Sequence, residues 1–447
     1  MKMPLYQALC SLSEAGHLRM HMPGHKGKGG GIFKEVAAID YTEIGPTGNL
    51  YTGEGPIAAA EALAAEAFGA EHAYFLTGGS TQGIMAGLSL CAAPGSTVLL
   101  DRNTHRAFFH AAGLLDLTPH YLYTLTPEAM EARLSACPEI AAVCITSPTY
   151  YGVVADIAAL AAVCRAHGVP LLVDEAHGAH FPFVGRGPCA AGRGATVSVS
   201  SAHKTLPALG SSALLFTDGS FSPREVREKT ALFGTSSPSY AIMASIDWAR
   251  GELTEGESGA AYRHVAQRTR ALRAHINDRG VFHALCEEDG LTLDPTRLTV
   301  QTSPAGLTGH EAGALLETEF GIDPEMASED AVVCILTCCD SDADLDRLSA
   351  ALDTLADRFA GGAPLPAAGQ PPVPAICCSL RTALFAKKEL LPLQDAAGRI
   401  SAVSVAPYPP GVPVIAPGER IDEPTLAYLA SIGYDLTTPV GVIPEGA

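Results

Sequence analysis

The sequence predicts an α/β fold in which helices cover both faces of a mainly parallel β-sheet. Short apolar stretches alternate with helical stretches along the first half of the chain, and most of the apolar stretches end in a polar loop. Parallel strands need long crossover connections, which are usually helices, so this alternation favours parallel pairing. The stretch at 169–173 is apolar throughout, as expected of a strand buried on both faces.

The chain has 447 residues, which is enough for two or three domains. Changes in composition divide it into five parts. We expect an N-terminal helix and Gly-rich arm at 1–40, a large α/β domain at 41–285, a small α+β domain at 286–360, a Pro/Gly/Ala linker at 361–375 and a C-terminal domain at 376–447.

The overall composition limits the class of protein. Hydrophobic residues make up 47% and charged residues 17%, which indicates a globular chain. No apolar run reaches the roughly eighteen residues that span a membrane. The formal net charge of −19 disfavours nucleic acid as a partner and is compatible with a cationic substrate. The N-terminus resembles no secretion signal, so we expect a cytoplasmic protein.

Twelve cysteines are scattered through the chain, many in apolar surroundings. In a cytoplasmic protein of this size we expect them to be reduced and buried. The adjacent pairs 338–339 and 377–378 lack the C-x-x-C spacing of a zinc site, so we predict no metal site.

The N-terminal part begins with a predicted helix over the first 20 residues. A Gly- and Pro-rich segment follows from His21, which is either a flexible tether or a loop shaped around a partner or ligand. After a second Gly-punctuated loop, 57–68 predicts an alanine-rich helix.

A strand at 73–76, a Gly-Ser-Thr turn and a helix come next. Backbone N–H groups and hydroxyls at such a helix start can hold a phosphate, which makes Ser80 and Thr81 candidates. A plain helix cap explains either residue separately. The turn matches neither G-x-G-x-x-G nor a Walker A loop, so dinucleotide or nucleoside triphosphate binding is disfavoured.

The strand at 98–101 leads into a polar loop that contains His105. A single histidine is more often a structural residue, but at a strand end it can also stack on a flat cofactor ring. The strand at 141–146 and the helix at 155–166 then return the chain to the strand at 169–173.

Two neighbouring predicted strands end at the residues that carry the chemistry. Asp174 follows the strand at 169–173, and Ser201, His203 and Lys204 follow a strand from Val197. The carboxyl ends of parallel strands share one edge of a sheet, so these side chains should face one site. A lysine whose pKa is lowered by burial can add to a carbonyl, and a carboxylate can keep the ring nitrogen of pyridoxal phosphate protonated. Taken separately, Asp174 could be a helix cap or an ion-pair partner and Lys204 a surface residue.

The remaining elements lie outside this site. The segment 210–216 continues the sheet, and a polar turn at 233–240 enters a helix that runs through Trp248. Thr308 and Glu311 form a capping box that opens a helix to Phe320, and 331–337 predicts a strand.

The motifs together resemble the bacterial ornithine/lysine/arginine decarboxylase family. They occur in the family's order over nearly the whole chain, beginning at His21, Thr77, Asp101, Ser147, Asp174, Ser201, Pro407 and Pro417. The resemblance implies a fold-type I pyridoxal-phosphate enzyme with the aspartate-aminotransferase architecture, a seven-stranded sheet in the large domain, and smaller α+β domains behind it. The chain resembles the short form, which lacks an extra N-terminal domain.

The resemblance also implies roles for individual residues. Lys204 would bind the cofactor as a Schiff base, Asp174 would hold the pyridine nitrogen, and His105 would stack on the ring. His177 would lie beside the cofactor near the reacting carbon. The phosphate would be held by Ser80, Thr81, Ser201 and His203.

The family resemblance extends to assembly and reaction. Members are dimers with shared sites, so Thr235 or Ser236 would reach the partner's phosphate. A basic amino acid, namely arginine, lysine or ornithine, would lose CO₂ and give the amine used in polyamine synthesis. Lys204 or His203 would return a proton to Cα.

Two departures from the family concern the substrate. The loop at 45–49 and the segment before Pro407, including Val403, lack acidic residues that the family carries there. A desolvated cation needs a carboxylate partner, and Glu43, Glu54 and Glu419 are the candidate replacements. An aminotransferase using Arg381 or Arg399 for the substrate carboxylate, a C–S lyase, a decarboxylase of another amino acid and a non-catalytic cofactor-binding homologue remain alternatives.

Overall fold

The computed structural model describes residues 1–366, 369–407 and 411–446. Its central element is a seven-stranded sheet with the order β1-β7-β6-β5-β4-β2-β3. The five strands from β3 to β6 run parallel, whereas β7 is antiparallel to both of its neighbours. The strands are β1 (His72–Leu76), β2 (Thr97–Asp101), β3 (Thr118–Leu122), β4 (Ile140–Thr146), β5 (Leu171–Asp174), β6 (Val197–Ser200) and β7 (Ala213–Thr217).

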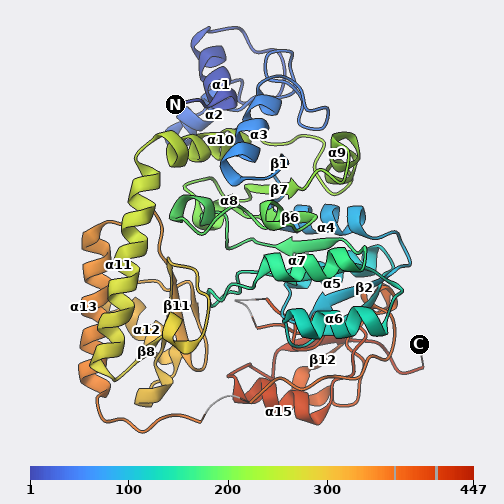
Figure 1. The fold of residues 1–447 in the computed structure, drawn as a ribbon, viewed down its shortest axis with the longest axis vertical. Coiled ribbons are helices and arrows are strands. Elements are labelled where there is room, and N and C mark those ends of the chain that lie inside the picture. Colours follow the sequence, from blue (N-terminus) through green and yellow to red (C-terminus); the bar gives the residue numbers. More distant parts are fainter. Residues whose placement is uncertain (367–368, 408–410, 447) are drawn as a thin grey trace.

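Helices cover both faces of this sheet, as predicted (Figure 1). Alternate residues of each strand belong to different apolar clusters; Tyr74 and Leu76 face one layer, and Ala73 and Phe75 face the other. One face carries α4 (Gly79–Cys91), α5 (Arg106–Leu114) and α9 (Pro223–Leu232). The opposite face carries α1 (Pro4–Glu14), α3 (Gly55–Phe68), α6 (Pro127–Ala136), α7 (Ile157–Ala166) and α10 (Tyr240–Glu255).

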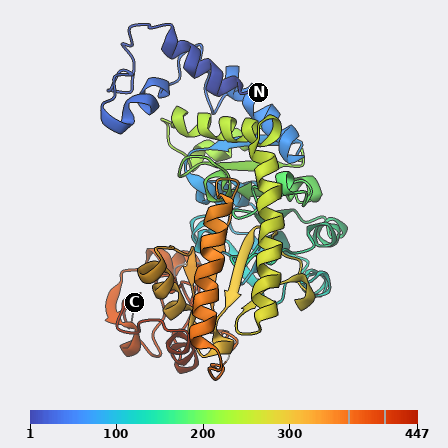
Figure 2. The same cartoon turned by 90° about the vertical axis from the view of Figure 1, so that its left-hand side faces the viewer.

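A second, antiparallel sheet has the order β10-β11-β9-β8. Its strands are β8 (His283–Ala284), β9 (Arg297–Gln301), β10 (Met326–Ala327) and β11 (Ala331–Ile335). The helices that pack with it are α11 (Ser258–Arg279), α12 (Gly309–Phe320) and α13 (Asp342–Phe359). Figure 2 shows α11 and α13 side by side in front of this sheet.

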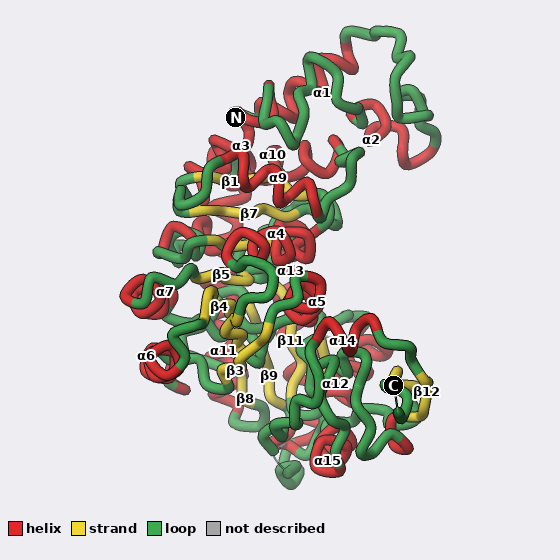
Figure 3. Tube along the Cα trace, turned by 90° about the vertical axis from the view of Figure 1, so that its right-hand side faces the viewer, coloured by secondary structure: helices red, strands yellow, loops and turns green. Residues whose placement is uncertain are grey.

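The C-terminal segment forms a third unit around a two-stranded ladder. It contains α14 (Leu380–Phe385), β12 (Glu389–Pro392), α15 (Glu423–Ser431) and β13 (Pro439–Val442). The segment lies against the large sheet through α14, which packs on α5 (Figure 3). A Cβ at Gly113 of α5 would lie 2.4 Å from a side-chain carbon of Leu384, so this contact is close.

Several element boundaries differ from the sequence prediction for local reasons. The first helix ends at Glu14 rather than near residue 20, because Gly16 adopts a φ of +66°. The short helix α2 (Lys34–Ile39) lies within the predicted Gly-rich arm. The capping box of Thr308 and Glu311 is confirmed at the start of α12. The proposed domain boundaries stay predictions, and residues 408–410 of the motif from Pro407 lie outside the described residues.

The prediction that the cysteines are reduced and buried is right only in part. All twelve are free, but only Cys91, Cys144, Cys164, Cys189 and Cys334 are buried. Cys339 is exposed in the turn after β11, and Cys377 is exposed in the irregular segment before α14. No helix in the described parts of the chain combines the length and the apolar character needed to cross a membrane.

Candidate active site

Asp174 and Lys204 lie at the same edge of the large sheet. Asp174 is the last residue of β5, and its Cα pairs with that of Val199 in the adjacent parallel strand β6. Lys204 does not follow the strand directly; it lies in the one-turn helix α8 (Ala202–Thr205), which begins just after β6 ends at Ser200. The predicted juxtaposition of acid and lysine is therefore present.

The Lys204 amine lies 3.0 Å from Nε2 of His177. Burial lowers the pKa of Lys204, while the negative charges of Asp174 and Glu325 act in the opposite direction. A lysine with a lowered pKa has a larger fraction of free amine at neutral pH, and the free amine is the nucleophile.

The Asp174 carboxylate is 3% exposed, and its Oδ1 accepts a hydrogen bond of 3.0 Å from the Ala176 N–H. Burial raises the pKa of Asp174, and the Lys204 charge together with the Ala176 N–H opposes that rise. A buried carboxylate at this place can hold a proton on a heteroaromatic nitrogen, which is the role that the sequence predicted.

His177 is buried between the two sheets. Nδ1 of His177 is 3.0 Å from Nη2 of Arg297 in β9, and its ring meets that of Tyr150 edge-on with centroids 4.6 Å apart. Burial, Lys204 and Arg297 together hold the pKa of His177 well below its usual value, so this ring is neutral. Arg297 was missed by the sequence reasoning, because nothing in the pattern of strand 297–301 distinguishes it from a surface arginine.

His105 has the structural role that the sequence left open, and its stacking on a cofactor ring stays a prediction. It caps α5, with Nδ1 accepting a 3.2 Å hydrogen bond from the Ala107 N–H. Burial lowers its pKa to about 4, and the Lys204 charge contributes further, which indicates that His105 is close to the lysine. The cap orients a ring that its lowered pKa keeps neutral.

Ser80 and Thr81, two of the predicted phosphate ligands, lie at the start of α4, and His203 is linked to that start through residues 211–212. The Gly79 N–H at this helix start donates to the Ser211 carbonyl, and His203 Nδ1 donates to the next carbonyl, that of Ser212, at 2.8 Å. Ser80 and Thr81 occupy the first turn of α4, half-buried and exposed respectively. Ser201 is fully buried, and its hydroxyl has no partner among the described residues.

Thr235 lies in an exposed loop close to α4. Its hydroxyl accepts a hydrogen bond from the Ser237 N–H, and its carbonyl accepts one from the Tyr51 hydroxyl. A Cβ at the preceding Gly234 would meet the Gln82 side chain of α4. Whether this loop serves a partner's site stays a prediction.

These residues fit pyridoxal phosphate. The unpartnered Ser201 hydroxyl and the α4 start suit the phosphate, buried Asp174 suits the ring nitrogen, and the Lys204 amine suits the aldehyde. His105 supplies a neutral ring beside them.

The neighbouring residues of the Asp174 motif have structural roles. Glu175 accepts from Arg193 at 2.6 Å and from the Ala190 N–H at 2.9 Å. His180 pairs with Asp294 at 2.9 Å, and both are completely buried or nearly so. Glu175 ties the loop after β5 to the segment before β6, and the His180–Asp294 pair ties it to the segment before β9 of the second sheet.

The His180–Asp294 pair should make the free energy of unfolding decrease at low pH. Burial would raise the pKa of Asp294, but the charges of His180 and Arg297 and the Thr296 N–H lower it to about 2. A carboxylate whose pKa is lower in the folded than in the unfolded protein stabilises the fold at pH values above its unfolded pKa of about 3.9. This stabilisation is lost as the pH falls toward 2. Urea unfolding of the wild type and Asp294→Asn across this range should therefore converge at low pH.

Comparisons with known proteins agree with the class that the fold and site define, a fold-type I pyridoxal-phosphate enzyme. The model of the Orn/Lys/Arg decarboxylase major domain matches residues 3–285, and that of its C-terminal domain matches 378–434. The chain belongs to the Orn/Lys/Arg decarboxylase family, which confirms the resemblance noted in the sequence.

Named relatives support this assignment, and solved structures are similar to the chain in fold. Arginine decarboxylases of Halalkalibacterium halodurans and Bacillus subtilis are each 32% identical to the chain, covering 95% of it and 92% of their own length. The fold is similar to lysine decarboxylases of Francisella novicida (TM-score 0.81, 18% identity) and Escherichia coli (0.79, 20%), each over 99% of this chain and 81% of theirs. A serine palmitoyltransferase of Sphingomonas wittichii matches more distantly, with TM-score 0.55 and 19% identity over 68% of this chain and 76% of its own.

The arginines considered for an aminotransferase are engaged elsewhere. Arg381 donates to the Leu114 carbonyl, and Arg399 binds Glu389 and the Ile443 carbonyl. Both guanidinium groups therefore support the packing of the C-terminal segment, which weighs against the aminotransferase alternative.

The candidate replacement carboxylates lie in different surroundings. Glu419 is 1% exposed and pairs with Arg102 at 3.0 Å, and its Oε1 has no partner among the described residues. Glu43 accepts from the Thr42 hydroxyl, and Glu54 is exposed. The sequence did not indicate Glu325, whose carboxylate accepts from the Tyr150 hydroxyl; the ring of Tyr150 contacts His177.

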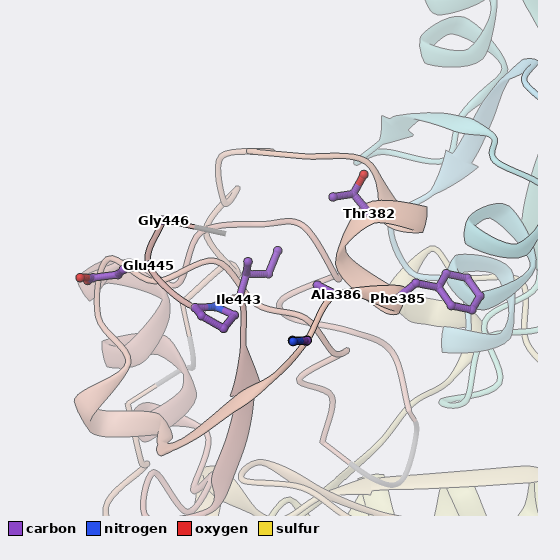
Figure 4. Close-up of a pocket in the computed structure, with 8 residues that line it drawn as sticks. Thr382, Phe385, Ala386, Ile443, Glu445 and Gly446 are labelled. Carbon is purple, nitrogen blue, oxygen red and sulfur yellow. The ribbon is translucent and has the colours of Figure 1, made fainter.

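A hollow of about 570 Å³ in the C-terminal segment is unrelated to this site. Figure 4 shows Phe385, Ile443 and Glu445 among the residues that line it. None of the predicted catalytic or cofactor residues lines this hollow.

Proposed function

We propose that the protein decarboxylates arginine and releases CO₂ and the corresponding amine. The observation that carries this proposal is the buried Asp174 and the Lys204 amine at one sheet edge, with neutral His105 and His177 close to the lysine. The choice of arginine is supported by two relatives that are named arginine decarboxylase and that match this chain over 92% of their own length.

The chain's residues divide the work. Pyridoxal phosphate, when bound, supplies the electron sink for the pair left on Cα when the bond to the carboxylate breaks. Asp174 keeps a proton on the ring nitrogen, and Ser80, Thr81, Ser201 and His203 hold the phosphate. Lys204 holds the cofactor between turnovers. Lys204 or His203 also returns a proton to Cα; His203 would act through Nε2, because its Nδ1 donates to the Ser212 carbonyl.

The assay that tests this proposal measures CO₂ and amine from purified, cofactor-loaded protein. We expect arginine to give one CO₂ per amine, and lysine, ornithine and neutral or acidic amino acids to react more slowly. Release of a keto acid would favour the aminotransferase alternative. Cofactor binding without CO₂ from any basic amino acid would rule out the proposal and leave a different reaction or a non-catalytic homologue.

We assign the cationic end of the substrate to Glu325. Its carboxylate is joined through Tyr150 to His177, and its charge acts on Lys204. It also borders a pocket of about 520 Å³ whose lining includes Asp323 and Asp340. Glu325 is exposed, and a carboxylate there can accept charge-assisted hydrogen bonds from a guanidinium.

Glu325→Gln should therefore raise KM for arginine about tenfold to a hundredfold, the value of one or two lost charge-assisted hydrogen bonds. Asp323→Asn is the matched control, because Asp323 is exposed on the same loop, as Glu325 is, whereas it is Glu325 that accepts from the Tyr150 hydroxyl and acts on Lys204. Steady-state kinetics of both variants make the comparison, and an unchanged KM in Glu325→Gln would remove Glu325 from substrate recognition.

The protein should act as a homodimer in the cytoplasm. Support for a second copy comes from the N-terminal arm, which projects from the body (Figure 2) and exposes Leu18, Met20, Ile32 and Phe33 by 67–88%. Apolar surface of this extent favours a protein partner. Sedimentation of the full chain and of a variant with serine at these four positions should show a dimer and a monomer respectively.

A further inference from the structure

Arg297 connects the second sheet to the catalytic lysine through His177. It opens β9 and is 2% exposed. Its Nη2 lies 3.0 Å from Nδ1 of His177, and its Nη1 donates to the Tyr150 carbonyl at 3.2 Å. The other ring nitrogen of His177 lies 3.0 Å from the Lys204 amine. The three side chains thus form a continuous chain of hydrogen bonds.

The chemistry of a guanidinium fixes the direction of these bonds. Arginine only donates hydrogen bonds, so Nδ1 of His177 must be the acceptor. In a neutral imidazole the remaining nitrogen then carries the hydrogen, so Nε2–H points at the Lys204 amine. An ammonium has no lone pair to accept this bond, whereas a free amine does.

We propose that Arg297 is a positioning residue that holds His177 in its Nε2–H tautomer and thereby keeps Lys204 as a free amine ready to bind the cofactor. This proposal rests on the cofactor role given to Lys204 above. The step it serves is the addition of the amine to the cofactor's aldehyde carbon, in which a C=N bond forms and one water leaves.

The surrounding backbone is shaped to accommodate the Arg297 side chain. A Cβ at Gly152 would come within 2.7 Å of both Cβ and Cγ of Arg297, so any larger residue there would displace its stem. Gly152 also has a φ of +87°, which favours glycine. The neighbouring Arg273 donates to the Arg297 carbonyl and supports the start of the strand.

Other charges also act on Lys204, and the test must separate them. Asp174 and Glu325 favour the ammonium, whereas burial and the positive charge of Arg297 disfavour it. His177 and His105 face the lysine as neutral rings. Arg297 could thus act directly by its charge or through His177.

The test follows cofactor uptake by the apo-protein as a function of pH, read from visible absorbance rather than turnover. Uptake should rise with pH as Lys204 loses its proton, with a midpoint below that of ordinary lysine. Arg297→Met should raise the midpoint by about one unit, which is a tenfold slower uptake at a fixed pH below both midpoints. Arg297→Lys, which keeps a charged donor, should restore most of the difference.

A second set of variants, made in the His177→Phe protein, shows whether Arg297 acts on Lys204 directly or through His177. In His177→Phe, the further change Arg297→Met should move the midpoint little, because the route through the imidazole is already lost. An equal rise in both backgrounds would show that the charge acts directly and would overturn the proposal. Arg273→Met is the control, since it loosens the same strand without contacting His177; it should lower stability and leave the midpoint unchanged.

Failure of the proposed function gives a different result. If the wild type takes up the cofactor with the expected pH profile but releases no CO₂ from arginine, only the arginine assignment fails. If Lys204→Ala shows the same uptake and pH profile as the wild type, the cofactor role of Lys204 fails, and the proposal for Arg297 falls with it.

Discussion

Lys204→Ala should abolish the visible absorbance of the bound cofactor and lower CO₂ release by at least about 10⁴-fold, the upper range for loss of a group that also transfers a proton. Alanine can neither bind the aldehyde nor return a proton to Cα. The fold should persist, because the amine contacts one neutral imidazole and no buried carboxylate loses a hydrogen bond with it.

Absorbance and CO₂ release of the loaded proteins are the two measurements. Lys388→Ala is the matched control, since Lys388 is exposed in the C-terminal segment, and it should behave as the wild type. A Lys204→Ala protein that retained full turnover would contradict the whole mechanism, and one that retained absorbance alone would move the attachment point to another lysine.

The residues that the sequence located correctly are those fixed by the ends of strands. Asp174, Ser201 and Lys204 follow two short apolar stretches, and the parallel pairing of β5 and β6 is sufficient to bring them together. Their register needs no knowledge of distant contacts. The same reasoning found the α4 start and His105, because β1 and β2 belong to the same sheet.

Arg297 begins β9 and Glu325 directly precedes β10, so both come from the region of the second sheet and could not be found in this way. Each reaches the site only because the antiparallel sheet packs against the loop after β5, through contacts such as His180 with Asp294. Sequence periodicity describes single elements and says nothing about how two sheets pack. A buried arginine and an exposed one look alike in the sequence.

The helix α11 was missed for a different reason, although a signal was present. Its buried residues include Tyr262, Val265, Thr269, Leu272 and Ile276, which recur every three or four positions. The stretch is otherwise polar and charged, so the apolar stripe is narrow. The spacing of these buried residues is sufficient to predict the helix, even though few of the residues in the stretch are apolar.

Asp174→Asn should leave cofactor attachment intact and lower kcat for CO₂ release by about 10³-fold, within the range of lost electrostatic stabilisation. Asparagine keeps the shape and can still accept from the Ala176 N–H through its carbonyl oxygen. It carries no negative charge, however, and so cannot hold a proton on the ring nitrogen. The electron pair left on Cα then has no protonated ring to enter.

The pH profile of cofactor uptake gives this prediction a second readout with a definite sign. The Asp174 charge raises the pKa of Lys204, so its removal should lower the uptake midpoint, opposite to the shift expected for Arg297→Met. Asp247→Asn is the control for loss of a buried carboxylate, because Asp247 pairs with Arg250 in α10. It should reduce stability while leaving kcat and the midpoint unchanged. A fall in kcat for Asp174→Asn with no shift of the uptake midpoint would show that the Asp174 charge does not affect the pKa of Lys204.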